Sequence, residues 1–127
     1  MQPVRKAINM GGVTVNLLVT PAVYGIARRK GLDLSISKES SMPEVMDTYC
    51  RMAYCAAVLA NEIERVDDPE IPVLAVKFSD VEEWRAQHPD EFMELVQFMY
   101  SALSQRPYSE LVLETIKKKK KPGMLNR

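Results

Sequence analysis

The stretch from Met42 to Val66, MPEVMDTYCRMAYCAAVLANEIERV, decides the fold of this chain of 127 residues. Apolar residues recur through it at alternating steps of four and three, the spacing that keeps side chains on one side of an α-helix. This seam consists of Val45, Tyr49, Met52, Ala56, Leu59, Ile63 and Val66. Ser41 and Glu44 are spaced as a capping box, which places the start of the helix. We therefore predict a long central core helix over residues 42–66.

The segment before this helix has the pattern of a β-hairpin. Two runs of β-prone residues, 4–8 and 13–19, are separated by Asn9, Met10, Gly11 and Gly12. Glycine tolerates the positive φ angles that a tight connection requires. Because an isolated hairpin is barely stable in water, we expect the hairpin over residues 4–19 to pack on the helices.

Capping residues and apolar spacing predict the remaining helices. Their predicted ranges are 21–30, 80–88 and 89–104, and the weak apolar pattern of 108–116 permits one more. Gly25, inside the first of them, predicts a close backbone approach. Thr20 is the expected N-cap of helix 21–30, and Ser79 with Glu82 the expected capping box of helix 80–88. The connection 67–77 contains two prolines and is open to two interpretations, a short strand near its end or an apolar loop laid over the core.

Together these elements predict a mainly α protein of the α+β class, with an N-terminal β-hairpin packed on a bundle of about four to five helices. The length suits a single globular domain, which we place at residues 1–116, followed by a disordered basic tail over 117–127.

Charge is distributed unevenly along the chain, although the formal net charge is zero. Residues 1–116 carry 11 basic and 17 acidic side chains, whereas residues 117–127 carry six basic and no acidic ones. A nucleic-acid-binding fold usually spreads its basic residues over the folded part, so nucleic acid is not an expected partner. The longest apolar stretch, MAYCAAVLA, is far shorter than the ~20 residues of a membrane span. The N-terminal apolar run is interrupted by polar residues, unlike a signal peptide, and we expect a cytoplasmic protein.

No pattern for catalysis or for cofactor or metal binding is present in the sequence. Cys50 and Cys55 would point about 140° apart on one helix, which excludes a shared disulfide or metal ion. The single histidine, His88, falls at a predicted helix boundary, where we expect it to be exposed. Nucleophile elbows, phosphate loops and zinc motifs do not occur. The sequence therefore predicts a protein that is not an enzyme, with no catalytic residue, cofactor or metal ligand.

Methionine and aromatic residues suggest a partner-binding role instead. The chain has eight methionines, whose flexible thioethers suit adaptable binding surfaces. More apolar surface is present than the short helices would hide, which predicts a face for a partner or for self-association. The predicted partner-binding residues are Met46, Tyr49, Met52, Phe92, Val96, Met99 and Leu103.

The order of the motifs resembles a known family. A glycine-turn hairpin, NMGGVTVNLLV, is followed by AVYGIARRKGLDL, by MPEVMDTYCRMAYCAAVLA, by FSDVEEWRAQHP and by DEFMELVQFMYSAL. Over about residues 4–104 this order is similar to that of the small tail assembly chaperones of tailed bacteriophages and prophages. The resemblance implies a non-enzymatic protein that binds the hydrophobic tape-measure protein, keeps it soluble and helps to recruit the tail-tube protein. The connection DDPEIPVLAVK departs from the family pattern.

Two alternatives remain open on the residues alone. One is a small DNA-associated or regulatory protein of a mobile element, which would use the lysine tail. The other is a helical structural oligomer. The run Lys117–Lys121 also has an interpretation from the resemblance, because genes of this family often contain a programmed frameshift, for which adenine-rich lysine codons would be a suitable site.

Overall fold

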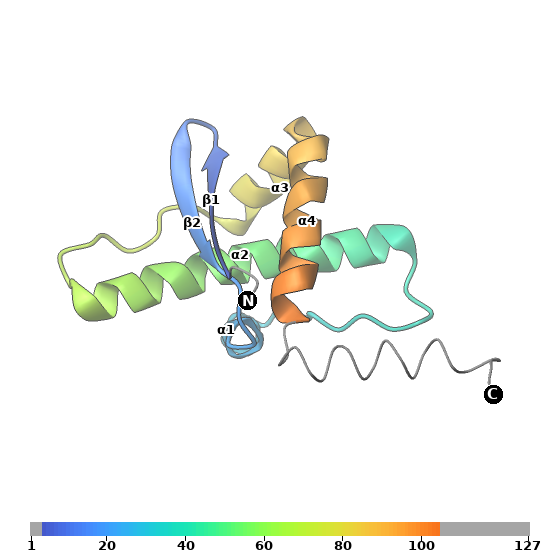
Figure 1. Ribbon diagram of the computed structural model, residues 1–127, viewed down its shortest axis with the longest axis horizontal. Helices are drawn as coiled ribbons and strands as arrows, with labels where there is room; N and C mark the ends of the chain where they lie inside the picture. Colours follow the sequence, from blue (N-terminus) through green and yellow to red (C-terminus); the bar gives the residue numbers. More distant parts are fainter. Residues whose placement is uncertain (1–3, 105–127) are drawn as a thin grey trace.

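Six elements are arranged around one central helix in the computed structural model, which describes residues 4–104. Their order is β1 (Arg5–Met10), β2 (Val13–Leu18), α1 (Val23–Lys30), α2 (Met42–Asp67), α3 (Phe78–Gln87) and α4 (Pro89–Leu103). Helix α2 runs along the long axis, with the hairpin and α3 above it, α1 below it and α4 crossing it (Figure 1). The predicted class, mainly helical α+β with an N-terminal hairpin, is confirmed. The predicted helix over 108–116 and the basic tail over 117–127 lie outside the described residues.

Helix α2 begins where the capping box predicts. The Ser41 hydroxyl accepts a hydrogen bond from the Glu44 N–H at 3.3 Å, and the Glu44 carboxylate accepts one from the Ser41 N–H at 2.7 Å. Small side chains fill the middle of the helix and are fully buried, which lets the surrounding elements approach its backbone closely. These residues are Ala53, Cys55, Ala56 and Ala57.

The prediction that the whole apolar seam of α2 belongs to the core is wrong for the last turns of the helix. Ile63 is 41% exposed and Val66 77% exposed. Figure 1 shows the reason, because this end of α2 extends past the hairpin, and α3 and α4 lie over other parts of the helix. The apolar spacing in the sequence extends further along α2 than the elements that cover this helix.

The hairpin forms as predicted, with β1 and β2 antiparallel and Ile8 paired with Val15. Gly11 and Gly12 adopt φ angles of 62° and 85°, and the Asn9 side chain accepts a hydrogen bond from the Gly12 N–H at 2.8 Å. Such angles are accessible to glycine at little cost, so these two residues allow the tight reversal. One face of the hairpin is buried, and β2 packs on α2, which confirms the prediction that the hairpin packs on the helices.

Helix α1 starts at Val23, two residues later than predicted, because residues 21 and 22 form a turn instead. The Thr20 hydroxyl accepts a hydrogen bond from the Ala22 N–H at 3.3 Å, so it caps this turn and not the helix itself. The expected close approach at Gly25 is wrong. Gly25 is exposed, and a Cβ placed there would meet nothing within 4 Å.

Helix α3 starts at Phe78, two residues earlier than predicted. The reason is that Asp80, and not the pair of Ser79 and Glu82, supplies the cap: its carboxylate accepts a hydrogen bond from the Lys77 N–H at 2.8 Å. Helix α4 follows directly from Pro89, as predicted, and ends at Leu103.

The connection between α2 and α3 is a loop and not a strand, which decides between the two interpretations of the sequence. The Asn61 side chain holds this loop on α2, because its amide donates to the Pro72 carbonyl at 3.0 Å and accepts from the Leu74 N–H at 3.0 Å. The Arg65 guanidinium adds a hydrogen bond of 2.9 Å to the Ile71 carbonyl. Leu74 packs half-buried against the core.

Candidate partner-binding groove

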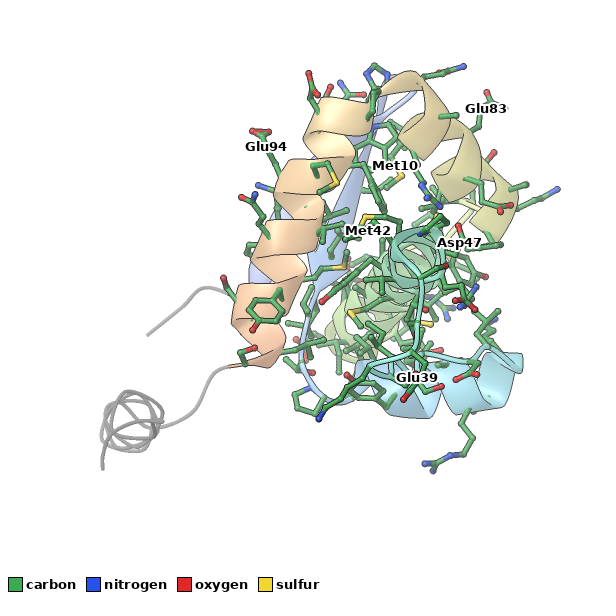
Figure 2. The ribbon with its side chains drawn as sticks, turned by 90° about the vertical axis from the view of Figure 1, so that its right-hand side faces the viewer. Met10, Glu39, Met42, Asp47, Glu83 and Glu94 are labelled. Carbon is green, nitrogen blue, oxygen red and sulfur yellow. The ribbon has the colours of Figure 1, made fainter. Side chains whose placement is uncertain are left out.

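A groove of about 420 Å³ lies where α1, the segment after α1, α2 and α4 meet. Figure 2 looks along α2 and shows α1 and α4 on two different sides of it. The volume falls within the ~300–1,000 Å³ typical of binding sites in proteins. The apolar and aromatic residues that line the groove are Tyr24, Leu34, Ile36, Tyr49, Met52, Tyr100 and Leu103. Three tyrosines from three different helices therefore face one space.

Helix α1 supplies the first wall through Tyr24. Its apolar stripe, Val23, Ile26 and Ala27, is buried, which orients α1 and leaves Tyr24 45% exposed on the adjoining face. At the other end of α1, the Arg29 guanidinium binds both Glu62 carboxylate oxygens of α2, at 2.9 and 2.8 Å. Because this pair is exposed to solvent, we expect it to contribute orientation more than stability.

The segment after α1 supplies the second wall and is held by polar contacts. The Arg51 side chain of α2 donates a hydrogen bond to the Asp33 carbonyl at 2.9 Å. The Asp33 carboxylate accepts hydrogen bonds from the Ser35 hydroxyl at 2.6 Å and from the Ser35 N–H at 2.8 Å, and these bonds lower the pKa of Asp33. Leu34 is buried between these anchors, whereas Ile36 remains 44% exposed at the groove. The wall is thus fixed on its inner side and apolar on its outer side.

The floor and the third wall come from α2 and α4. Tyr49 and Met52 of α2 are buried, and Tyr100 near the end of α4 is 64% exposed. Burial raises the pKa of the Tyr49 phenol, and the neighbouring Tyr100 and Tyr24 raise it further. The Tyr49 hydroxyl therefore stays neutral at physiological pH and can both donate and accept a hydrogen bond at the base of an apolar groove.

Of the residues that the sequence predicts for partner binding, some line the groove and the others lie elsewhere in the structure. Tyr49, Met52 and Leu103 line the groove. Met46 is only partly buried and lies outside the groove lining, and the other three belong to the core: Phe92 is 3% exposed, Val96 8% and Met99 0%. The apolar stripe of α4 is turned inward against the core, so these three side chains do not form an outward face in this structure. The side of α4 that carries Glu94 points outward instead (Figure 2).

The three large apolar residues that are exposed at the groove, namely Tyr24, Ile36 and Tyr100, were missed by prediction from the sequence. The two tyrosines contribute to the apolar surplus visible in the sequence, but they lie beside the helical seams and not on them. Ile36 lies in a loop, for which no periodicity exists. Only the folded chain brings the three together.

The His, Cys, Asp and Glu side chains of the described residues are not part of the groove lining. Within residues 4–104, no three or more His, Cys, Asp or Glu side chains are grouped so as to hold a metal ion. Cys55 is fully buried, and burial raises the pKa of its thiol to about 11. His88 is exposed at the boundary between α3 and α4, where its Nδ1 lies 3.2 Å from a Glu91 carboxylate oxygen. None of these groups faces the groove, whose walls offer apolar contact and tyrosine hydroxyls.

None of the helices described over 4–104 combines the length and the apolar character needed to cross a membrane.

Comparison of the chain with protein-family models, with curated proteins and with solved structures finds no match. The resemblance of residues 4–104 to tail assembly chaperones therefore stays a prediction from the sequence pattern.

Proposed function

We propose that this protein is a non-enzymatic tail assembly chaperone that holds an apolar helical segment of the tape-measure protein in the groove between α1, α2 and α4. The observation that carries the proposal is the exposure of large apolar side chains around a buried apolar floor. Tyr24, Ile36 and Tyr100 are 45%, 44% and 64% exposed. A groove of this kind suits a partner that is bound through apolar contact.

The three tyrosines suit an amphipathic helix as the bound segment. A tyrosine ring buries a large area while it loses few rotamers, and its hydroxyl satisfies a polar group at the edge of a contact. A helix that presents apolar residues at positions i, i+3 and i+4 would place them along the groove, as helix-in-groove complexes do. Met52 at the floor can adapt to side chains of different shape.

The choice of client rests on the sequence resemblance together with the chemistry of the groove. The lining residues that belong to the described range 4–104 carry no ionised side chain, so a strongly charged partner such as nucleic acid would gain little from them. A tape-measure protein is long, helical and hydrophobic, and its amphipathic segments match this lining. The family resemblance adds the tail-tube protein as a second partner and a cytoplasmic site of action.

Co-expression with a tape-measure protein from the same genome tests the proposal. The wild-type chain should keep the client soluble and should co-purify with it. The double substitution Tyr24→Ser with Tyr100→Ser should weaken binding by about 30-fold or more, because each truncated aromatic contact at the centre of an interface costs on the order of 1 kcal/mol or more.

Matched controls are Met93→Ser and Val66→Ser, which remove exposed apolar side chains outside the groove. Both should bind the client as the wild type does. The proposal fails if the wild-type chain leaves the client insoluble, or if the double variant and the controls bind equally. Light scattering on the protein alone detects the alternative of a structural oligomer, in which a fixed assembly would cover the groove without a client.

A further inference from the structure

We infer that the groove selects client segments with an uncharged polar side chain in the middle of their apolar stripe, because the Tyr49 hydroxyl needs a hydrogen-bond partner once a client fills the groove. The side chain would be that of a serine, threonine, asparagine or glutamine. The inference rests on the proposed function for the identity of the client, and it adds what that client has to contain. Tyr49 would then determine specificity, whereas the other walls supply apolar contact.

Tyr49 lies at the floor of the groove, and its side chain is almost completely buried. Its exposed fraction is 9%, and it lines the groove together with Met52 one turn further along α2. No hydrogen bond within residues 4–104 engages its hydroxyl, and none contributes to its pKa. Among the described residues, Trp84 Nε1 is the one buried polar side-chain atom that is sealed from water without a partner. The Tyr49 hydroxyl is not sealed in this way, so it meets water in the open groove.

The other polar groups of the groove do not replace the water that a client would expel. The Ser35 hydroxyl already donates to the Asp33 carboxylate at 2.6 Å. Tyr24 and Tyr100 are largely exposed, and neither is hydrogen-bonded to Tyr49 in the described part of the chain. A new partner for the buried hydroxyl therefore has to come from the client.

The chemistry of this partner follows from the cost of leaving a buried hydroxyl unpaired. A purely apolar client would expel the water and offer nothing in return, which lowers affinity by roughly tenfold or more. A charged client side chain would be buried where the described lining residues carry no opposite charge, so it would bind worse still. A phenol both donates and accepts hydrogen bonds, and a neutral hydroxyl or amide can serve either role. One neutral polar residue within an apolar stripe is therefore the best match.

A double-mutant cycle between the protein and short amphipathic helical peptides tests the inference. Each peptide presents apolar residues at positions i, i+3, i+4 and i+7, and the two members of a pair differ only at the centre, which is threonine or its isostere valine. Fluorescence anisotropy of the labelled peptides gives Kd for the wild type and for Tyr49→Phe. The wild type should bind the threonine peptide about tenfold more tightly than the valine peptide. Tyr49→Phe should show no such preference, because its ring keeps the apolar contact and has no hydroxyl to pair.

Two matched variants remove a phenolic hydroxyl elsewhere. Tyr54→Phe changes a residue of α2 outside the groove lining, where the Tyr54 ring packs edge-on against Phe78 with centroids 5.9 Å apart. Tyr100→Phe removes an exposed hydroxyl of the groove wall, which water can serve with or without a client. Both variants should keep the wild-type preference for threonine. Equal preference in the wild type and Tyr49→Phe, or an equal loss of preference in all three variants, would overturn the inference.

Overlapping peptides that cover a tape-measure protein from the same genome separate this inference from the proposed function. If the designed peptides show the preference while no tape-measure peptide binds, the inference stands and the proposed client is wrong. If tape-measure peptides bind and Tyr24→Ser with Tyr100→Ser abolishes their binding, while the threonine and valine peptides bind the wild type equally, the proposed function stands and the inference fails. Absence of binding by both sets would overturn both.

Discussion

Replacement of Cys55 by alanine should make the stability of the protein less sensitive to alkaline pH. Cys55 lies in the middle of α2 and is 0% exposed. Burial raises the pKa of its thiol from 9.0 to about 11, and the positive charge of Lys30 offsets only part of that effect. In the unfolded chain water surrounds the thiolate, so the ordinary pKa applies there.

The raised pKa fixes the direction of the effect. Below pH 9 both the folded and the unfolded chain keep the thiol proton, and the contribution of the neutral thiol to stability is fully present. Between pH 9 and 11 the unfolded chain releases its proton while the folded chain retains it, so the free energy of unfolding falls as the pH rises. At pH 10.5 the loss from this one group amounts to about 2 kcal/mol, since one pKa unit corresponds to ~1.4 kcal/mol.

Urea unfolding at pH 7.5 and pH 10.5, followed by the fluorescence of the single tryptophan, measures this loss for the wild type, Cys55→Ala and Val58→Ala. The destabilisation caused by Cys55→Ala should shrink by about 2 kcal/mol between the two pH values, because the variant has no thiol to titrate. Val58→Ala, a nearby truncation without a titratable group, should cost the same at both. An unchanged cost of Cys55→Ala would show that the thiolate is solvated in the folded protein and would refute the reasoning.

Three further substitutions probe the backbone of the fold by thermal or urea unfolding. Ser41→Ala removes the hydroxyl that accepts from the Glu44 N–H, so it should lower the free energy of unfolding by about 1 kcal/mol; an unchanged midpoint would show that water replaces the cap. Gly25→Ala should stabilise the protein by about 0.5 kcal/mol or more, because a methyl group meets no neighbour there and the unfolded chain loses freedom. Gly12→Ala should do the opposite, since φ is 85° at that position, and a gain in both variants would contradict the distinction.

The elements that could be predicted from sequence are those whose signals are local. The bounds of α2 follow from a capping box at Ser41 and from apolar spacing that persists for about six turns, from Val45 to Val66. The hairpin follows from the two glycines of its turn. The predicted start of α3 was wrong because two capping patterns overlap within the six residues 77–82, and only the fold shows that Asp80 supplies the cap.

The groove was harder to predict, because no segment of the chain contains it. Spacing identifies which residues of α4 share a side, but it does not tell whether that side meets the core or water. Met99 and Tyr100 are neighbours in sequence, yet Met99 is fully buried and Tyr100 is 64% exposed. The contribution of Ile36 depends on how the segment after α1 is anchored by Arg51, and a contact between residues 18 positions apart leaves no periodic trace.

The hydrogen bonds between the Asn61 side chain and the loop after α2 have a practical consequence for labelling the protein. Because the loop is held from Ile71 to Leu74, the exposed residues 68–70 lie between two fixed points, the end of α2 and the hydrogen bonds from Asn61 and Arg65. Figure 1 places this segment at the end of α2 opposite to the segment that follows α1. A fluorophore or epitope inserted there would be distant from the groove wall. It would offer a handle for binding experiments that leaves both chain ends and the candidate site in their native form.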